Sequence, residues 1–287
     1  MTTPIDFDLD QHQVRRAFSR AAKGYDEAAV LQQEVCDRLG MRLDYIKFKP
    51  QKILDLGAGS GIASQMLMTR YKRARVYALD FAEPMLKLAA SRGSWLNRPK
   101  AVCADALKLP LKDQSIDLVF SNLMLQWCHP LDNYFAEMRR VLGPGGLLLF
   151  STFGPDTVKE LREAWQAVDG RSHVHQFIDM HDIGDMLVGA GFTEPVVNME
   201  MFTLTYSDIK TLLKDLKAIG ATNAASSRTK GLTGKGTYRE LEAAYEQFRN
   251  AENKLPLSYE VIYGTAWVSD APQPSSLPAQ HTILQKQ

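Results

Sequence analysis

The segment that most constrains this chain is an apolar run that ends in an acid and three alternating glycines, Ile53-Leu54-Asp55-Leu56-Gly57-Ala58-Gly59-Ser60-Gly61. The run predicts a buried β-strand, and the glycines predict a tight turn, because glycine adopts positive φ and leaves the backbone open to a ligand. The helix expected after the turn presents unpaired N–H groups at its start. Together these features predict a site for an adenosine-containing ligand.

The glycine spacing indicates which class of ligand fits. Dinucleotide-binding turns read G-x-G-x-x-G and place a pyrophosphate at the helix start. Here the pattern is G-x-G-x-G, and Ile62 follows Gly61. The dinucleotide pattern is therefore not met.

Two further acids stand at the ends of predicted strands. Residues 74 to 80 read as a second strand that ends at Asp80, where such folds hold a ribose hydroxyl. Residues 101 to 103 read as a third strand that runs into Asp105, whose carboxylate could accept from an adenine amino group. A single such acid would more often cap a turn, but three of them after a glycine turn favour a ligand site.

From these motifs the chain resembles the class I S-adenosylmethionine-dependent methyltransferases over residues 50 to 153. Residues 120 to 127 (FSNLMLQW) resemble the fourth-strand signature, and residues 140 to 150 (RVLGPGGLLLF) resemble a helix stop, turn and fifth strand. The resemblance implies an α/β fold, with a doubly wound, mostly parallel seven-stranded sheet, and S-adenosylmethionine as cofactor. The cofactor-binding residues that it implies are Asp55, Gly57, Gly59, Gly61, Asp80, Phe81, Asp105, Ala106, Asn122 and Leu123.

The pattern along the chain predicts one domain over residues 1 to 268. N-terminal helices are expected over 9 to 47, the cofactor-binding core over 50 to 206 and the last strand over 257 to 268. Residues 207 to 256 form an insertion far longer than usual loops of roughly 4 to 6 residues, which predicts a helical lid. Residues 269 to 287 are expected to be a disordered tail.

Composition excludes several classes of function. The formal net charge of +1 gives no overall field for nucleic acid. No window of about 18 apolar residues predicts a membrane span, and the acidic N-terminus is unlike an export signal, so a cytoplasmic protein without membrane contact is expected. The three cysteines, Cys36, Cys103 and Cys128, predict buried thiols in a reducing compartment. The six histidines lack metal-ligand spacing, so they are expected to be structural or surface residues and no metal is expected.

Two stretches carry one-sided basic charge. The first holds Arg15, Arg16, Arg20 and Lys23 without an acid. The second holds one acid, Asp215, against six basic residues, Lys214, Lys217, Arg228, Lys230, Lys235 and Arg239. Such runs are often solvated helix faces, but a run on a lid beside a cofactor also fits an acidic partner.

Four segments together resemble a narrower family, the malonyl-acyl carrier protein O-methyltransferases of biotin synthesis. They are residues 18 to 26 (FSRAAKGYD), 122 to 128 (NLMLQWC), 213 to 223 (LKDLKAIGATN) and 255 to 261 (LPLSYEV), and the resemblance covers nearly residues 10 to 268. It implies methylation of the free carboxylate of a malonyl thioester on acyl carrier protein, giving a methyl ester that primes pimeloyl synthesis. A monomer is expected. The glycine-rich stretch 229 to 236 departs from the family pattern.

The chemistry of that reaction sets the expected residue roles. A carboxylic acid of reference pKa about 4 is ionised at neutral pH, so no general base is required and the site must orient the carboxylate and exclude water. Lys217 and Arg228 are expected to hold the carboxylate or the phosphopantetheine, and Tyr25 to cover the cofactor and contact the carboxylate. Arg20, Gln126, Trp127 and Lys214 are expected to bind substrate. Tyr25 and Trp127 could instead be packing residues.

Two other functions fit the same sequence. One is methylation of another small acceptor, such as a quinone or a free acid, because the cofactor core would look the same. The other is a role without methylation, as a respiratory-complex assembly factor or arginine hydroxylase of this fold. The intact glycine turn and acids argue against a lost site, but they do not separate methylation from hydroxylation.

Overall fold

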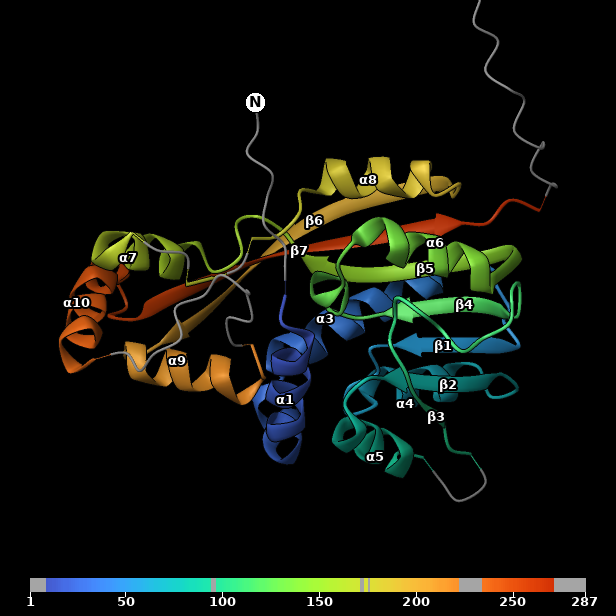
Figure 1. The fold of residues 1–287 in the computed structure, drawn as a ribbon, viewed down its shortest axis with the longest axis horizontal. Helices are drawn as coiled ribbons and strands as arrows, with labels where there is room; N and C mark the ends of the chain where they lie inside the picture. Colours follow the sequence, from blue (N-terminus) through green and yellow to red (C-terminus); the bar gives the residue numbers. More distant parts are fainter. Residues whose placement is uncertain (1–8, 94–96, 171–172, 175, 222–233, 271–287) are drawn as a thin grey trace, which may run out of the picture.

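A seven-stranded sheet in the order β3-β2-β1-β4-β5-β7-β6 forms the centre of the molecule (Figure 1). This computed structural model describes residues 9–93, 97–170, 173–174, 176–221 and 234–270. Strands β1 to β5 pair in parallel, and β7 is antiparallel to both β5 and β6. The predicted doubly wound, mostly parallel α/β sheet is therefore confirmed. The strands are β1 (Lys52–Leu56), β2 (Arg75–Asp80), β3 (Lys100–Cys103), β4 (Ile116–Ser121), β5 (Leu142–Phe153), β6 (Thr193–Tyr206) and β7 (Leu255–Trp267).

Helices cover both faces of the sheet because side chains alternate along each strand. In β4, Leu118 and Phe120 belong to the core that includes α3, α4 and α7, whereas Val119 belongs to the core that includes α6 and α8. Ile116 also belongs to the second core, because the register shifts between Ile116 and Leu118. The α-helices are α1 (Gln11–Ala21), α2 (Tyr25–Ala28), α3 (Val30–Met41), α4 (Ile62–Arg70), α5 (Glu83–Ser91), α6 (Leu131–Val141), α7 (Lys159–Asp169), α8 (Met180–Gly189), α9 (Ile209–Ala218) and α10 (Lys235–Tyr245). Short 3-10 helices are η1 (Ala22–Gly24), η2 (Arg42–Asp44), η3 (Leu125–Trp127) and η4 (Glu246–Phe248).

The Gly-Pro-Gly-Gly segment differs from the expected helix stop and separate turn. The preceding helix α6 does end at Val141, but β5 begins at the next residue and contains the glycines. The register with β4 shifts there, because Ile116 pairs with Leu142 and Leu118 pairs with Leu147. Gly145 has φ of +67° and donates its N–H to the carbonyl of Val268 at 3.0 Å. The glycines thus form an irregular start of the strand.

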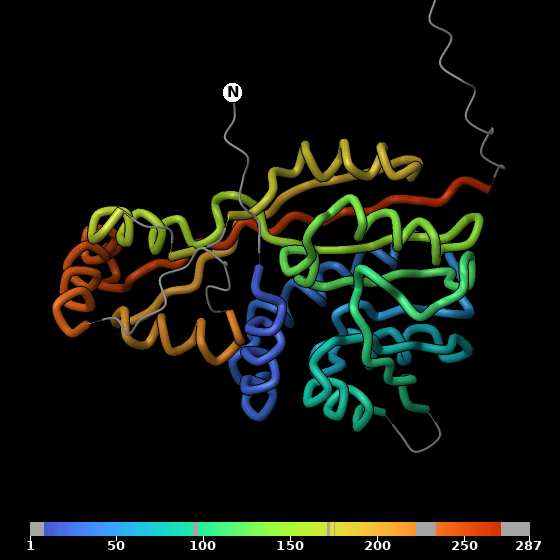
Figure 2. Tube along the Cα trace, viewed as in Figure 1, coloured from blue at the N-terminus to red at the C-terminus, as the bar shows by residue number. Residues whose placement is uncertain are grey.

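Strands β6 and β7 are long and carry the insertion away from the cofactor-binding core (Figure 2). Helix α10 packs against α7 at the far end of these strands, whereas α9 runs back toward α1 and α2 (Figure 1). The described end of this helical segment, from α9 to Ala221, therefore lies toward the core.

The structure also bears on the predictions for membrane spans, thiols and the C-terminal tail. No described helix is both long and apolar enough to cross a membrane. The expectation of buried thiols holds for Cys36 and Cys128 but is wrong for Cys103, which is exposed at the end of the edge strand β3. The predicted tail lies outside the described residues from position 271 onward.

Candidate functional site

The glycine turn lies between β1 and α4 and is fastened to β2. Gly57, Gly59 and Gly61 have φ of +72°, +53° and +87°, as the sequence spacing requires. The N–H groups of Gly57 and Ala58 donate to the carbonyl of Leu79, at 2.8 and 2.9 Å. The N–H of Gly59 donates to Oδ2 of Asp80 at 2.9 Å. The first two strand ends therefore form one rigid corner.

A first cavity, with about 700 Å³ of space free of atoms, opens over this corner. Eight of the ten predicted cofactor-binding residues line it: Gly57, Gly59, Asp80, Phe81, Asp105, Ala106, Asn122 and Leu123. Gln11, Phe18, Tyr25, Leu79, Ala104, Leu107, Met124, Trp127 and Cys128 complete its wall. We call it the cofactor cavity.

Asp80 and Asp105 place two carboxylates on this wall. Asp80 accepts a second N–H, from Ala82 at 2.8 Å, and Asp105 accepts from the N–H of Leu107 at 2.9 Å. Burial raises the pKa of Asp80, while the N–H donors of Ala82 and Gly59 oppose that rise. Both carboxylates keep acceptor capacity, since each oxygen has two lone pairs.

Asp55 and Gly61 do not line the cofactor cavity. Asp55 is 1% exposed and accepts a hydrogen bond from Oγ of Ser64 at 2.5 Å. Burial is the main cause that raises its pKa to about 7, and the charge of Asp80 contributes. Gly61 starts α4, where a Cβ would lie 2.6 Å from Cα of Ala89 in α5. These two residues therefore stabilise the glycine turn without facing the cofactor cavity.

A second cavity, with about 760 Å³ of free space, adjoins the first. The two share Phe18, Tyr25, Leu123 and Trp127. The other lining residues come from distant parts of the chain: Gln32, Gln126, Phe153, Thr157, Val158, Leu161, His173, Val174, Phe177, Leu216, Ile219, Ala221 and Tyr259. We call it the acceptor cavity.

The predicted pocket residues Gln126 and Trp127 both lie in this lining. Gln126 is held in place because its Nε2 donates to the carbonyl of Leu123 at 2.6 Å and its Oε1 accepts from Thr152 Oγ1 at 3.2 Å. The Trp127 ring packs edge-on against Phe18 with centroids 5.4 Å apart. Phe18 and Trp127 thus form an aromatic wall that the two cavities share.

Tyr25 lies at the junction of the cavities, at the start of α2. Burial, followed by the negative charges of Asp80 and Asp26, raises the pKa of its phenol well above the usual value. The phenol therefore stays protonated at neutral pH and can donate a hydrogen bond. That geometry fits the predicted contact with a substrate carboxylate.

Three of the predicted basic residues, Arg20, Lys214 and Lys217, are described by the structure and lie outside the acceptor cavity. Arg20 and Lys217 line a separate surface groove between α1 and α9, and neither lines the acceptor cavity. Lys214 is exposed on α9 and lines none of these three cavities. Arg228 lies outside the described residues. The role predicted for Lys217 beside the carboxylate stays a prediction, and its side chain lines the groove and not the acceptor cavity.

Sequence reasoning missed several lining residues of the acceptor cavity. Phe153, Phe177 and Tyr259 carry no local signal, since Phe153 and Tyr259 converge only through the pairing of β5 with β7 and Phe177 comes from the connection between α7 and α8. His173 was expected to be structural or on the surface, but its half-buried ring lines the acceptor cavity. The ring stacks on Trp165 at 3.8 Å, and Nε2 lies 2.9 Å from Oδ2 of Asp169. The only local signal was the spacing of His173, four residues after Asp169 at the end of α7.

Comparisons with known proteins agree with this geometry. Residues 54–150 match a family model described as a methyltransferase domain. The solved YcgJ protein of Bacillus subtilis has a TM-score of 0.55 at 15% identity, over 81% of this chain and 98% of that one. A phosphoethanolamine N-methyltransferase of Haemonchus contortus, solved with S-adenosylhomocysteine, has a TM-score of 0.53 at 19% identity, over 81% of this chain and 53% of that one. These likenesses establish the fold.

Two relatives are much more similar in sequence. A malonyl-[acyl-carrier protein] O-methyltransferase of Gallionella capsiferriformans is 52% identical over 91% of this chain and 92% of its own length. One of the same name from a Methylovorus species is 51% identical over 92% of this chain and 90% of its own length. Such identity over nearly full length places the chain with them: it belongs to the malonyl-[acyl-carrier protein] O-methyltransferase family.

Proposed function

We propose that this enzyme transfers a methyl group from S-adenosylmethionine to the free carboxylate of a malonyl thioester on acyl carrier protein. The observation that carries the proposal is the pair of adjoining cavities that share Phe18, Tyr25, Leu123 and Trp127. A methyl donor bound in the first cavity and an acceptor bound in the second would meet beside these shared residues. The product, a malonyl-carrier methyl ester, would serve as the primer for pimeloyl synthesis in biotin formation, as expected from the family.

The cofactor cavity has the chemical groups that S-adenosylmethionine requires. Asp80 can accept from ribose hydroxyls and Asp105 from the adenine amino group, beside the close backbone approach at Gly57 and Gly59. Phe81 and Leu123 add apolar walls for the adenine and the methionyl chain. When bound, the cofactor supplies a methyl group on a positively charged sulfur.

The residues of the acceptor cavity support the transfer by binding and shielding. A malonyl carboxylate is already ionised at neutral pH, so its oxygen can attack without a base. Tyr25, as a neutral donor, would hold one carboxylate oxygen and leave the other to form the new bond. The apolar side chains of Phe18, Leu216 and Ile219 would keep water from competing.

The finer assignments also belong to this proposal. We place the reaction in the cytoplasm, where thiols such as the exposed Cys103 stay reduced. We also expect the enzyme to act as a monomer.

Mass spectrometry tests the proposal directly. Malonyl-carrier protein, acetyl-carrier protein and malonyl-coenzyme A are each incubated with the purified chain and S-adenosylmethionine. A gain of one methyl on the malonyl carrier, and none on the acetyl carrier, is expected because only malonyl offers a free carboxylate. No gain on any malonyl thioester, with cofactor still bound, would reject the proposed acceptor.

A further inference from the structure

The structure assigns a docking surface for the carrier protein to the groove between α1 and α9. This inference rests on the proposed function and adds how the macromolecular substrate is recognised. We define the basic groove by its four cationic or potentially cationic side chains, His12, Arg16, Arg20 and Lys217. We propose that these side chains bind carboxylates on the surface of the carrier protein.

The four side chains line the groove from two helices. His12, Arg16 and Arg20 are four residues apart on α1, so they follow one stripe along the helix. Lys217 stands in the last turn of α9, opposite this stripe. Gly220, two residues after the end of α9, packs against α1, and an added Cβ there would lie 3.3 Å from Cδ1 of Phe18. The arrangement is therefore set by helix packing.

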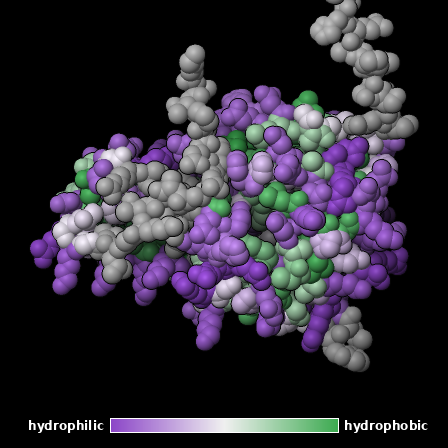
Figure 3. Space-filling model, in the orientation of Figure 1, coloured by the Kyte–Doolittle hydropathy of each residue, from purple (hydrophilic) through white to green (hydrophobic). Residues whose placement is uncertain are grey.

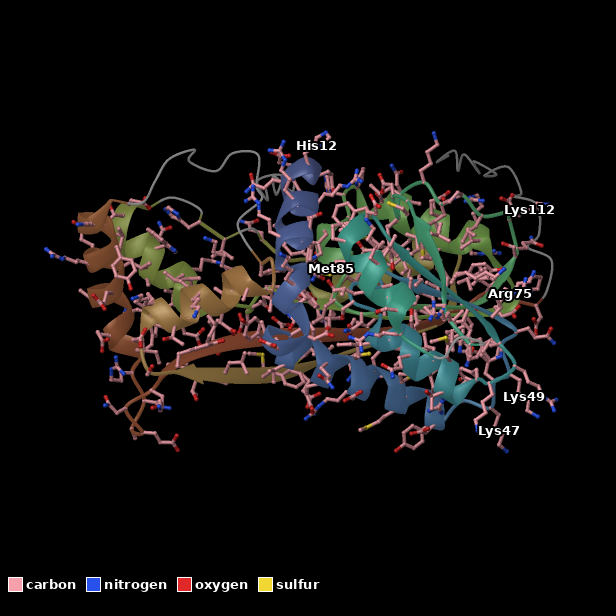
Figure 4. All side chains as sticks on the ribbon, turned by 90° about the horizontal axis from the view of Figure 1, so that it is seen from below. His12, Lys47, Lys49, Arg75, Met85 and Lys112 are labelled. Atoms are coloured by element: carbon pink, nitrogen blue, oxygen red, sulfur yellow. The ribbon has the colours of Figure 1, made fainter. Side chains whose placement is uncertain are left out.

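All four side chains are exposed to solvent. His12 marks the outer end of α1 in Figure 4, and the visible surface over α1 is largely hydrophilic in Figure 3. A macromolecule can therefore reach the whole stripe.

The described lining of the groove carries more basic side chains than acidic ones, with Arg16, Arg20 and Lys217 against Asp10. Other arginines, such as Arg70 and Arg140, pair with carboxylates at 2.6 and 2.7 Å. In the residues that the structure describes, the side chains of Arg16, Arg20 and Lys217 make no ion pair or hydrogen bond, unlike the paired arginines. Asp10 also lines the groove, but its Oδ1 caps α1 by accepting from Gln13 N.

Local helix stability explains only part of this charge. Arg20 and Lys217 lie in last helical turns, where a cation is favoured by the helix dipole. Arg16 lies in the middle of α1, and cations four residues apart repel each other by about 0.2–0.5 kcal/mol per pair. A stripe that is slightly unfavourable for the isolated helix fits a binding role.

The position of the groove favours the carrier protein as occupant. The same two helices wall the acceptor cavity on their other side, through Phe18, Leu216 and Ile219. A carrier docked in the groove would therefore lie next to the cavity that its malonyl group must enter. The groove is also wide, with about 1890 Å³ of free space open to solvent, which suits the side chains of a protein surface better than a single phosphate.

Charge-reversal variants test the proposal. The double variant Arg16→Glu with Lys217→Glu should raise KM for malonyl-carrier protein at least about tenfold with kcat nearly unchanged, since rim charges act mainly on association. Its KM for malonyl-coenzyme A, which has phosphates but no protein, should not change. The matched control Arg15→Glu with Lys210→Glu carries the same charge change on the same two helices outside the groove, and it should behave like the parent protein.

A binding measurement makes the test independent of turnover. Fluorescence anisotropy of labelled malonyl-carrier protein should show Kd raised about tenfold by the groove variant, and the parent protein should bind more weakly as salt increases. Equal KM increases for the carrier and coenzyme A substrates would mean that the groove binds the phosphate of the phosphopantetheine group instead of the carrier protein. Unchanged carrier binding, or an equal effect of the control variant, would overturn the proposal. Failure of all methylation with charge-dependent carrier binding intact would reject the reaction and keep the docking site.

Discussion

At the scale of single residues, the titration of Asp55 makes the free energy of unfolding depend on pH. Its pKa of about 7, against an ordinary 3.8, means that the folded state favours the neutral carboxyl. Its contribution to the free energy of unfolding is therefore greatest below pH about 4 and is lost as the pH rises through about 7. Asp55→Asn keeps an acceptor for Ser64 and removes the titration. Relative to the parent, the variant should gain on the order of 2–4 kcal/mol between pH 4.5 and pH 8.

Urea unfolding of both proteins without cofactor at these two pH values measures the gain. The comparison uses the difference between variant and parent at each pH, so that other titrating groups cancel. An equal difference at both values would mean that Asp55 titrates normally.

Asp80 should matter for cofactor affinity more than for stability. Asp80→Ala removes a charged acceptor from the cofactor cavity and also releases the N–H groups of Gly59 and Ala82. Loss of charged hydrogen bonds, worth about 1.5–3 kcal/mol, should raise Kd for S-adenosylmethionine roughly 10- to 100-fold. Isothermal titration calorimetry measures this change. Lys214→Ala, outside the cofactor cavity, is the control and should leave Kd unchanged.

At the scale of elements, the contact between α4 and α5 depends on a glycine. Gly61 has φ of +87°, and a Cβ there would lie 2.6 Å from Cα of Ala89. Gly61→Ala must therefore strain the backbone and separate the two helices, at an expected cost of about 2–4 kcal/mol. Gly24→Ala is the matched control, since that glycine has negative φ and nothing within 4 Å of an added Cβ. Thermal unfolding should show a lower Tm for the first variant and little change for the second.

Elements were predictable from the sequence where the signal is local. The apolar runs and the glycine spacing gave β1, β2 and the turn between them, because strand burial and positive φ leave marks in neighbouring residues. The meeting of distant side chains in one cavity leaves no such local pattern in the sequence. Phe153 and Tyr259 reach the acceptor cavity only because β5 and β7 pair. Likewise the charge pattern identified Lys217, but the packing of α9 decides that it faces the groove.

At the scale of the whole molecule, α1 connects the two cavities. Phe18 lines both, and its ring lies 5.4 Å from Trp127 and 6.5 Å from Phe81. A ligand that fixes these rings in one cavity should also order the wall of the other, so the cofactor and the malonyl thioester should increase each other's affinity. By linkage, the factor must be the same in both directions.

Phe18→Ala should therefore weaken both ligands and reduce their coupling. Calorimetry with S-adenosylhomocysteine, alone and with saturating malonyl-coenzyme A, measures the coupling factor. In the parent we expect a factor of about 5 or more, and in the variant a factor near one, together with several-fold weaker binding of each ligand. Phe48→Ala is the control, because Phe48 is also half-buried and packs edge-on against Trp267 away from both cavities. If that control loses coupling as well, the cause is general loosening of the fold. If Phe18→Ala keeps the full factor, the shared aromatic wall does not transmit binding between the two cavities.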